Sequence, residues 1–268
     1  MGRVIALLTD FGTRDGYVGA VKGVLLSRAP GATILDLAHD IPAGDVEAAG
    51  FALAQVAGEL PAGAVCLSVV DPGVGGSRRA LAVASRGLLH VAPDNGLLAR
   101  VLEGDARARV HSIEGLERTG RPSRPDEVSA VFHGRDVFAP AAAWLACGGP
   151  LRSLGPRVEL AGLVLGARPR ARWRGGVGEG AVVHVDRFGN LITNLRVESA
   201  VPTGVVELAG AAIPTARTYG DVAPGQLLAV RGSSGWLEVA CNRGSAADVL
   251  GARPGSVVTW RLHPPAPE

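Results

Sequence analysis

The sequence predicts an α/β fold in which an N-terminal, mostly parallel sheet flanked by helices precedes a smaller C-terminal all-β, barrel-like domain. Over residues 4–70, short apolar runs alternate with segments of helical length, which is typical of a parallel sheet covered by helices. Beyond residue 170, helical periodicity nearly disappears, and short β-like runs alternate with turn residues. We therefore expect two domains, residues 1–168 and residues 169–268.

In the N-terminal half, we expect strands, helices and one exposed loop in a regular order. Asp15 and Asp45 stand where each of the first two helices would take an N-cap. The expected strands cover residues 4–8, 32–38, 64–70, 80–85, 88–92 and 109–113. The expected helices cover residues 16–28, 45–58, 97–102 and 137–147, and the loop covers residues 119–127.

In the C-terminal half, an Arg- and Gly-rich stretch at residues 166–180 has the composition of a linker. Its alternating arginines, such as Arg172 and Arg174, are expected to form a solvated face of that linker. The β-like runs that follow cover residues 181–185, 191–195, 205–208, 226–230, 236–240 and 257–262.

Composition excludes several classes of protein. The chain has 268 residues, 47% of them hydrophobic, which allows an ample core. A net charge of +2 and only 4% aromatic residues argue against a nucleic-acid partner. Cys66, Cys147 and Cys241 lie far apart in apolar contexts, so we expect buried free thiols in a reducing compartment. No apolar run reaches about 18 residues and no charged leader is visible, so we expect a cytoplasmic protein without a membrane partner.

Carboxylates follow each of the first three expected strands: Asp10, Asp40 and Asp71. The carboxyl ends of parallel strands share one edge of a sheet, where ligands bind, so these acids should converge. The loop after the third strand combines Asp71 with three glycines and Arg78. Glycines allow a ligand to approach the backbone closely, which favours a binding site. A turn with a capping Asp and a solvated Arg has the same composition and stays open.

Three further stretches place polar groups beside glycines or aromatic residues. His133 is followed by Gly134 and lies at the start of an expected helix, although a lone histidine is more often structural. Residues 186–190 and 232–238 can be binding loops or simple hairpin turns. Neither the dinucleotide-binding glycine pattern nor a P-loop is present. A metal site is a further alternative, with candidate ligands Asp10, His39, Asp40, Asp71 and His133, although no pair has the i, i+4 spacing of helical ligands.

Six motifs occur in order over nearly the whole chain. They are TDFGxxDxYVGxxKG at residues 9–23, VVDPGVGG at 69–76, APDNGLL at 92–98, FHGRDVFAP at 132–140, DxFGNLITN at 186–194 and SSGxLExAxNxGSA at 233–246. This set resembles the adenosine-forming S-adenosyl-L-methionine (SAM) hydrolases, also called SAM hydroxide adenosyltransferases, which are relatives of the fluorinases and chlorinases.

The resemblance implies hydrolysis of SAM to adenosine and L-methionine by attack of water on the ribose C5′, without a metal or redox cofactor. It implies a water-activating triad of Asp71, Arg78 and His133. The halogenating relatives carry Tyr at the Asp position and lack the His, so water is the expected nucleophile. The resemblance also implies a homotrimer that binds SAM between the N-terminal domain of one subunit and the C-terminal domain of its neighbour.

The remaining motif residues match substrate-binding positions of the family. Asp10 corresponds to the acid that binds the ribose diol, and Asp186 and Ser233 correspond to positions near the methionine amine and carboxylate. The other expected contacts are Phe188 and Asn190 beside adenine, Glu238 from the hydrolase form of the last motif, and the backbone of Cys241.

Three alternatives stay open at this stage. A non-catalytic SAM or adenosine sensor would share the binding motifs but would not need Asp71, Arg78 and His133 together. A metal-dependent nucleoside or phosphoester hydrolase would use the acids at the strand ends and would be sensitive to EDTA. A halogenase is disfavoured because both Asp71 and His133 are present.

Overall fold

The structure is a computed structural model that describes residues 3–114, 128–166, 169–198 and 203–262. The chain divides into two compact units, Met1–Gly166 (unit 1) and Ala167–Glu268 (unit 2), and each is described by itself. None of the helices in the described ranges combines the length and the apolar character needed to cross a membrane.

Unit 1 contains a seven-stranded sheet in the order β2-β1-β3-β5-β4-β6-β7. The neighbours β2, β1, β3 and β5 are parallel, whereas β4 runs antiparallel to both β5 and β6. The predicted mixed α/β fold with a mostly parallel sheet is therefore confirmed. The strands are β1 (Val4–Thr9), β2 (Thr33–Ala38), β3 (Val65–Val69), β4 (Ala80–Ser85), β5 (Leu88–Pro93), β6 (Arg109–Ser112) and β7 (Arg157–Val158).

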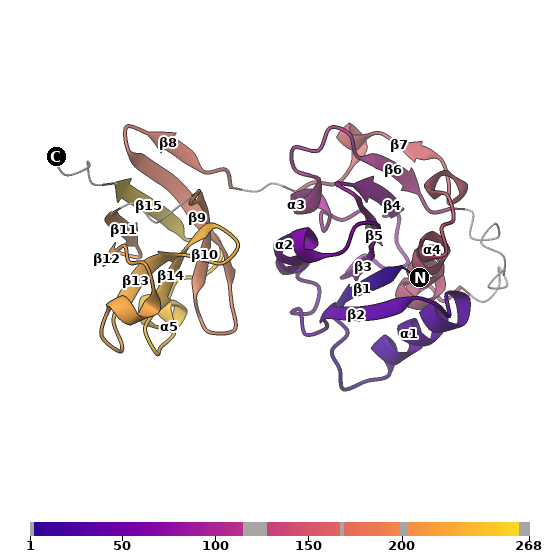
Figure 1. The fold of residues 1–268 in the computed structure, drawn as a ribbon, viewed down its shortest axis with the longest axis horizontal. Helices are drawn as coiled ribbons and strands as arrows, with labels where there is room; N and C mark the ends of the chain where they lie inside the picture. The colour runs from indigo at the N-terminus through magenta and orange to yellow at the C-terminus, as the bar shows by residue number, and fades with distance from the viewer. Residues whose placement is uncertain (1–2, 115–127, 167–168, 199–202, 263–268) are drawn as a thin grey trace. The chain divides into compact units, whose positions relative to one another are not determined.

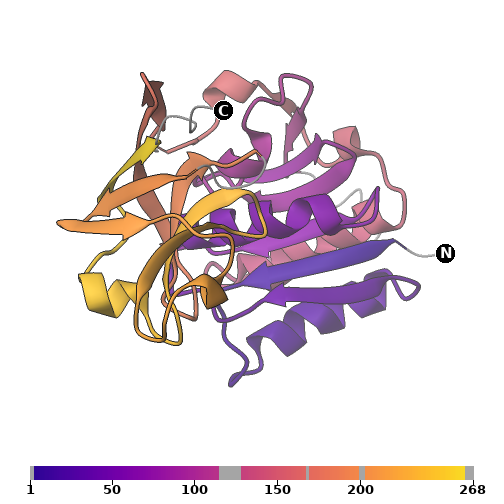
Figure 2. The same cartoon turned by 60° about the vertical axis from the view of Figure 1, so that its left-hand side comes forward.

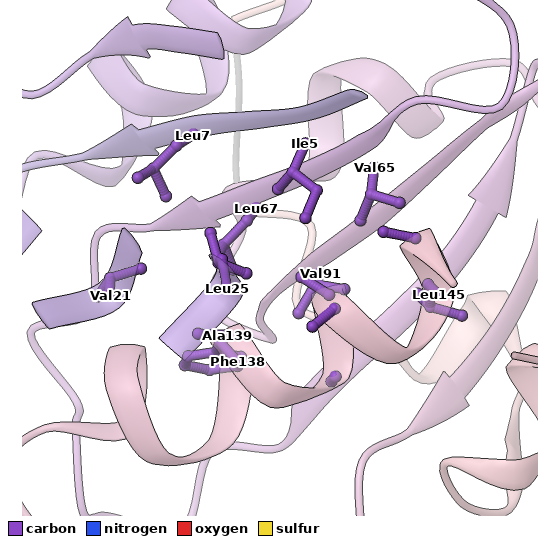
Figure 3. Close-up of a cluster of buried hydrophobic side chains, with 14 of the residues drawn as sticks. Ile5, Leu7, Val21, Leu25, Val65, Leu67, Val91, Phe138, Ala139 and Leu145 are labelled. Atoms are coloured by element: carbon purple, nitrogen blue, oxygen red, sulfur yellow. The ribbon is translucent and has the colours of Figure 1, made fainter. Parts of the chain in front are cut away.

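Helices cover both faces of this sheet (Figure 1). On one face lie α1 (Tyr17–Arg28) and α4 (Ala139–Ala146), and on the other lie α2 (Val46–Val56) and α3 (Ala99–Leu102). Alternate residues of the strands supply the two apolar clusters, because successive side chains of a strand point to opposite faces. Figure 2 shows α1 lying alongside the strands, and Figure 3 shows Phe138 and Ala139 on the helical side of the first cluster.

Of the two predicted N-cap residues, one is confirmed and the other is wrong. The side chain of Asp45 accepts a hydrogen bond from the amide of Ala48 at 2.9 Å and caps α2, as predicted. The predicted cap by Asp15 is wrong. Because α1 begins at Tyr17, Gly16 occupies the N-cap position and makes no side-chain hydrogen bond.

The helix expected over residues 137–147 begins earlier and has a different first turn. A π-helical turn covers Gly134–Phe138 and leads directly into α4. Cys147 caps the C-terminus of α4 at the surface, and its thiol donates to the carbonyl of Arg28 at 3.6 Å. The expectation of a buried thiol is therefore wrong for Cys147, whereas Cys66 and Cys241 are buried; all three cysteines are free.

Unit 2 contains an eight-stranded antiparallel sheet in the order β12-β11-β15-β9-β10-β14-β13, with β8 paired to β9. A bridge between Thr215 and Ala229 brings the two end strands together, so the predicted barrel-like form is confirmed. The strands are β8 (Arg172–Arg174), β9 (Val177–Val185), β10 (Leu191–Arg196), β11 (Gly204–Leu208), β12 (Ala211–Pro214), β13 (Leu227–Arg231), β14 (Trp236–Cys241) and β15 (Val257–Leu262).

Residues 166–180 are not a linker throughout, because β8 and the start of β9 lie within them. The alternating arginines of β8 flank Trp173, whose ring meets that of Trp260 edge-on at 5.5 Å. The spacing of two residues between these arginines therefore reflects a strand and not a linker. The short helix α5 (Ala246–Leu250) was not expected, and the predicted loop at 119–127 lies outside the described residues.

Candidate active site

The loops after the first three parallel strands of unit 1, β1, β2 and β3, contact one another. Asp10 follows β1, and its carboxylate accepts a hydrogen bond from the amide of Gly44, in the loop after β2, at 2.8 Å. The amide of Gly12 donates to the carbonyl of His39 at 2.8 Å. A Cβ on Gly44 would lie 3.6 Å from the Pro72 ring, beside Asp71. The strand order β2-β1-β3 thus brings the loops that carry Asp10, Asp40 and Asp71 to one edge of the sheet.

Asp71, Arg78 and His133 form one connected group at this edge. The Nε of Arg78 donates to both carboxylate oxygens of Asp71 at 3.0 Å, and its Nη2 contacts Oδ2 at 2.5 Å. The same Nη2 lies 2.7 Å from Nδ1 of His133, 55 positions away in the sequence. Only 12% of the Arg78 side chain and 5% of the Asp71 side chain are exposed. The guanidinium also lies 5.2 Å from the centre of the Phe138 ring.

The contact between Arg78 and His133 determines the state of the imidazole. A guanidinium only donates hydrogen bonds, so Nδ1 of His133 must accept and Nε2 carries the proton of the neutral ring. Burial and then the positive charge of Arg78 lower the pKa of His133, and the carboxylates of Asp71 and Asp136 only partly oppose them. The site therefore presents a neutral imidazole at neutral pH, with one N–H available as a donor.

The turn that carries His133 is held by local aromatic and ionic contacts. A Cβ on Gly134 would lie 3.1 Å from the Phe11 ring, so a larger residue here would require that ring to shift by a few tenths of an ångström. Asp136 accepts hydrogen bonds from the amide of Ser129 at 2.9 Å and from Nε of Arg135 at 2.7 Å. Burial alone would raise the pKa of Asp136, but these bonds and the charge of Arg135 lower it overall. A π-helical turn of this kind is frequent at functional sites.

Arg79, adjacent to Arg78, points to a different partner. Its Nε donates to the buried carboxylate of Asp94 at 2.8 Å, and its Nη2 donates to the carbonyl of Gly162. Of the two adjacent arginines, the structure therefore places Arg78 with Asp71 and His133.

The expected metal ligands do not gather into a cluster. Both ring nitrogens of His39 are engaged, Nδ1 with Thr9 Oγ1 at 2.9 Å and Nε2 with Asp36 at 3.0 Å. Among the residues that the structure describes, no three His, Cys, Asp or Glu side chains are arranged to hold a metal ion. The arrangement therefore gives no support to the metal-dependent alternative.

In unit 2, Asp186 organises its own turn. Its Oδ1 accepts from the amides of Phe188 at 2.8 Å and Asn190 at 2.9 Å, and its Oδ2 accepts from the Asn190 side chain at 2.9 Å. These bonds hold the turn between β9 and β10, in which Gly189 has a φ of +79°. Phe188 is 75% exposed, whereas Asn190 is buried. The turn thus presents an aromatic ring on the surface of unit 2.

Glu238 is a buried carboxylate on β14. A Cβ on Gly232 would overlap its side chain, so only a glycine leaves room for it in the hairpin loop. Burial, and then the charge of Asp186, raise the pKa of Glu238, and a hydrogen bond from the Tyr219 hydroxyl only partly opposes them. Burial and the same two carboxylates raise the pKa of Tyr219, so its hydroxyl stays protonated and donates.

The other expected residues of unit 2 lie at both ends of β14. Ser233 is exposed in the loop between β13 and β14. The carbonyl of Cys241 accepts a hydrogen bond from the amide of Gly244 at 3.1 Å. Sequence reasoning missed Tyr219 and Phe138 as neighbours of candidate residues. Phe138 lies within the motif at residues 132–140, but that motif does not show its contact with Arg78, and no motif includes Tyr219, because each contact joins separate elements of the chain.

Both units match models of one protein family. The model of the SAM hydroxide adenosyltransferase N-terminal domain matches residues 5–155, and that of its C-terminal domain matches residues 180–259. A protein of Thermus thermophilus named (R)-S-adenosyl-L-methionine hydrolase is 45% identical over 96% of this chain and 98% of its own length. A protein of Salinispora tropica with the same name is 44% identical over 94% of this chain and 95% of its own length.

More distant relatives and solved structures agree. A fluorinase of an Actinoplanes species is 29% identical over 75% of this chain and 74% of its own length. The crystal structure of a conserved protein of Thermotoga maritima matches with a TM-score of 0.85 and 33% identity, covering 96% of this chain and 99% of that chain. The crystal structure of a conserved Thermus thermophilus protein matches with a TM-score of 0.80 and 44% identity, covering 97% of this chain and 100% of that chain. This chain belongs to the SAM hydroxide adenosyltransferase family.

Proposed function

We propose that this protein hydrolyses SAM to adenosine and L-methionine by attack of water on the ribose C5′. The names of the two most similar relatives described above support this substrate and reaction. The observation that carries the proposal is the connected group of Asp71, Arg78 and His133 at the edge of the sheet. A protein that only binds SAM has no need for a buried carboxylate, a guanidinium and a neutral imidazole in contact.

The difficult part of this reaction is the nucleophile. The sulfonium of SAM departs as a neutral thioether and needs no acid, whereas water is weakly nucleophilic and must approach C5′ in line with the C–S bond. In our proposal, Asp71 accepts a hydrogen bond from the water, and the Nε2–H of His133 helps to orient it. Arg78 holds both partners in place, because positioning a reactant and its catalytic groups removes much of the entropic barrier.

The proposed reaction replaces the C5′–S bond with a C5′–O bond and releases one proton. The water oxygen forms a bond to C5′ while the C–S bond breaks and sulfur keeps the electron pair. One proton leaves the water, first shared with the Asp71 carboxylate and then released to solvent. The products are adenosine, L-methionine and a proton.

The residues expected to hold the substrate lie in both units. Asp10 is proposed to bind the ribose diol, and Phe188 and Asn190 are proposed to contact adenine. Asp186 and Ser233 are proposed to face the methionine part, with the Cys241 backbone beside adenine, and Glu238 is proposed as a further substrate contact. We also propose that the chain works as a homotrimer in which neighbouring subunits complete each site, and light scattering at micromolar concentration would test this.

The deciding experiment is chromatography of purified, EDTA-treated protein incubated with SAM. Equal growth of adenosine and methionine would support hydrolysis without a metal, and heavy-oxygen water should label the adenosine 5′-hydroxyl. Turnover that EDTA abolishes and a divalent metal restores would support the metal-dependent alternative. Tight binding of SAM without turnover would overturn the proposal in favour of a sensor.

A further inference from the structure

The turn that follows β5 contains Asp94 and Asn95, and neither residue belongs to the catalytic group or to the expected substrate contacts. Asn95 donates from Nδ2 to the carbonyl of Val70 at 2.8 Å. Val70 is the residue immediately before Asp71, and it is fully buried. Asn95 thus holds the start of the loop that carries Asp71.

Asp94 holds the other end of the same loop. Its amide donates to the carbonyl of Arg79 at 2.9 Å, and its carboxylate accepts from Nε of Arg79 at 2.8 Å. Arg79 is the residue immediately after Arg78. Because Arg78 and Arg79 are adjacent, anchoring Arg79 to Asp94 also limits where the Arg78 side chain, which binds Asp71, can lie.

The turn itself has little freedom to move. Oδ1 of Asn95 accepts from the amide of Leu97 at 3.2 Å, which fixes the direction of its amide group. Oδ1 of Asp94 accepts from the amide of Val164 at 2.9 Å, and only 3% of the Asp94 side chain is exposed. A Cβ on Gly50 of α2 would lie 2.7 Å from the Leu97 carbonyl oxygen, so helix and turn pack closely.

We propose that Asp94 and Asn95 are positioning residues for catalysis: together they hold both ends of the loop that places Asp71 and Arg78. This inference rests on the proposed hydrolase function, because the geometry of that loop matters most when Asp71 and Arg78 must meet a water molecule in line with C5′. Misplacing catalytic groups by about 1 Å can lower a rate by roughly 100-fold.

The test is the pair of variants Asn95→Asp and Asp94→Asn, each nearly the same size as the native residue. Asn95→Asp places a carboxylate oxygen against the Val70 carbonyl, and we expect it to lower kcat by roughly 10- to 100-fold. We expect adenosine affinity, measured by calorimetry, to change by less than about 3-fold, because Asp10 and unit 2 are untouched. Asp94→Asn weakens the ion pair with Arg79 and should lower kcat by about 10-fold.

A double-mutant cycle separates positioning from a purely structural role. In an Arg78→Gln background, Asn95→Asp should lower kcat by no more than about 2-fold, because the loop no longer carries a complete catalytic group. Equal losses of kcat in both backgrounds would overturn the inference. If the Asn95→Asp variant does not fold, the same cycle with Asp94→Asn distinguishes positioning from a purely structural role.

Asp105→Asn is the matched control for Asp94→Asn. Asp105 also accepts hydrogen bonds from a side chain and an amide of unit 1, those of Ser85 and Arg107, but it does not touch the catalytic loop. We expect its kcat to equal that of the wild-type protein, and a loss matching that of Asp94→Asn would also overturn the inference. If the wild-type protein itself shows no turnover of SAM, the proposed function fails, which is a different result from unaltered kcat in the Asn95 and Asp94 variants.

Discussion

Unit 1 and unit 2 hold their polar residues in different ways. In unit 1, Asp71, Arg78 and His133 bind one another across distant parts of the chain and are largely withdrawn from solvent. In unit 2, Asp186 is bound within its own five-residue turn, and the neighbouring Phe188 is 75% exposed. Long-range contacts fix the geometry of reacting groups, whereas a local turn presents a surface for recognition. This contrast supports the proposal that unit 1 carries the chemistry and that unit 2 supplies much of the substrate binding.

The largest expected effect tests the chemical role of unit 1. Asp71→Asn keeps the shape of the side chain but removes the charge that is proposed to accept the proton of the attacking water. We expect kcat to fall by about 100-fold or more, with adenosine affinity nearly unchanged. Chromatography of adenosine and calorimetry with adenosine measure the two quantities. An equal loss of turnover and of adenosine binding would mean that Asp71 acts in substrate binding, which would contradict the proposed division of roles between the units.

The next effect concerns the pH profile. Because the pKa of His133 is lowered, the ring stays neutral until the pH falls below its ordinary value of about 6.5. Protonation then places a proton on Nδ1, facing Arg78, so kcat should decrease on the acid side with a midpoint below about 6.5. Folding stability should decrease in the same direction, because the unfolded chain binds this proton more readily.

His133→Gln checks the assignment of that acid limb. This variant keeps a hydrogen-bonding side chain that does not titrate. We expect kcat at neutral pH to fall by about 10-fold and the acid limb to disappear. An unchanged limb in the variant would assign the titration to another group.

A smaller effect tests recognition by unit 2. Phe188→Ala removes an exposed ring that is proposed to contact adenine, and stacking of a base on an aromatic ring contributes about 1–3 kcal/mol. We expect adenosine affinity to weaken by about 10-fold while the melting temperature stays within about 1 °C of the wild-type value. Trp173→Ala is a suitable comparison, since its ring is also partly exposed but packs on Trp260. That variant should lose stability and keep its adenosine affinity.

The smallest effect concerns the stability of unit 2. Burial and Asp186 raise the pKa of Glu238, so the folded protein binds this proton more tightly than the unfolded chain. Ionised Glu238 therefore destabilises the fold, increasingly as the pH rises through its folded pKa. Glu238→Gln should be more stable than the wild-type protein at pH 8, and the difference should vanish at pH 4. Thermal melts at pH 8 and pH 4 measure this difference in stability. A Glu238→Gln variant that is less stable than the wild-type protein at pH 8 would contradict the prediction.

Much of the fold followed from the sequence because apolar periodicity is a local signal. The alternation of strands and helices up to residue 70 and the change of pattern beyond residue 170 both predicted what the structure shows. Asp45 caps its helix because it directly precedes the first helical residue, whereas Asp15 stands one position too early. The strand β8 was hidden because its three residues are exposed, and the contact of Trp173 with Trp260 joins positions far apart in the chain.

The candidate site was less accessible to sequence reasoning. The family resemblance grouped Asp71, Arg78 and His133 as a triad, but no local pattern shows that the Arg78 guanidinium lies between the other two. The π-helical turn after His133 was equally not predicted, and the sequence does not show that the Phe11 ring lies close to Gly134 within it. The role of each substrate-binding residue stays a prediction, because it depends on a bound substrate.

Arg78 neutralises Asp71 before any substrate arrives. In the proposed reaction, a positively charged sulfonium therefore gains little electrostatic attraction from this pair, so SAM should bind more tightly than adenosine mainly through the proposed contacts with its methionine part. Adenosine keeps the proposed ribose and adenine contacts, so it should still compete with SAM, and progress curves are expected to bend as product accumulates. Added salt should change this product inhibition little, because screening acts mainly on exposed, unpaired charges.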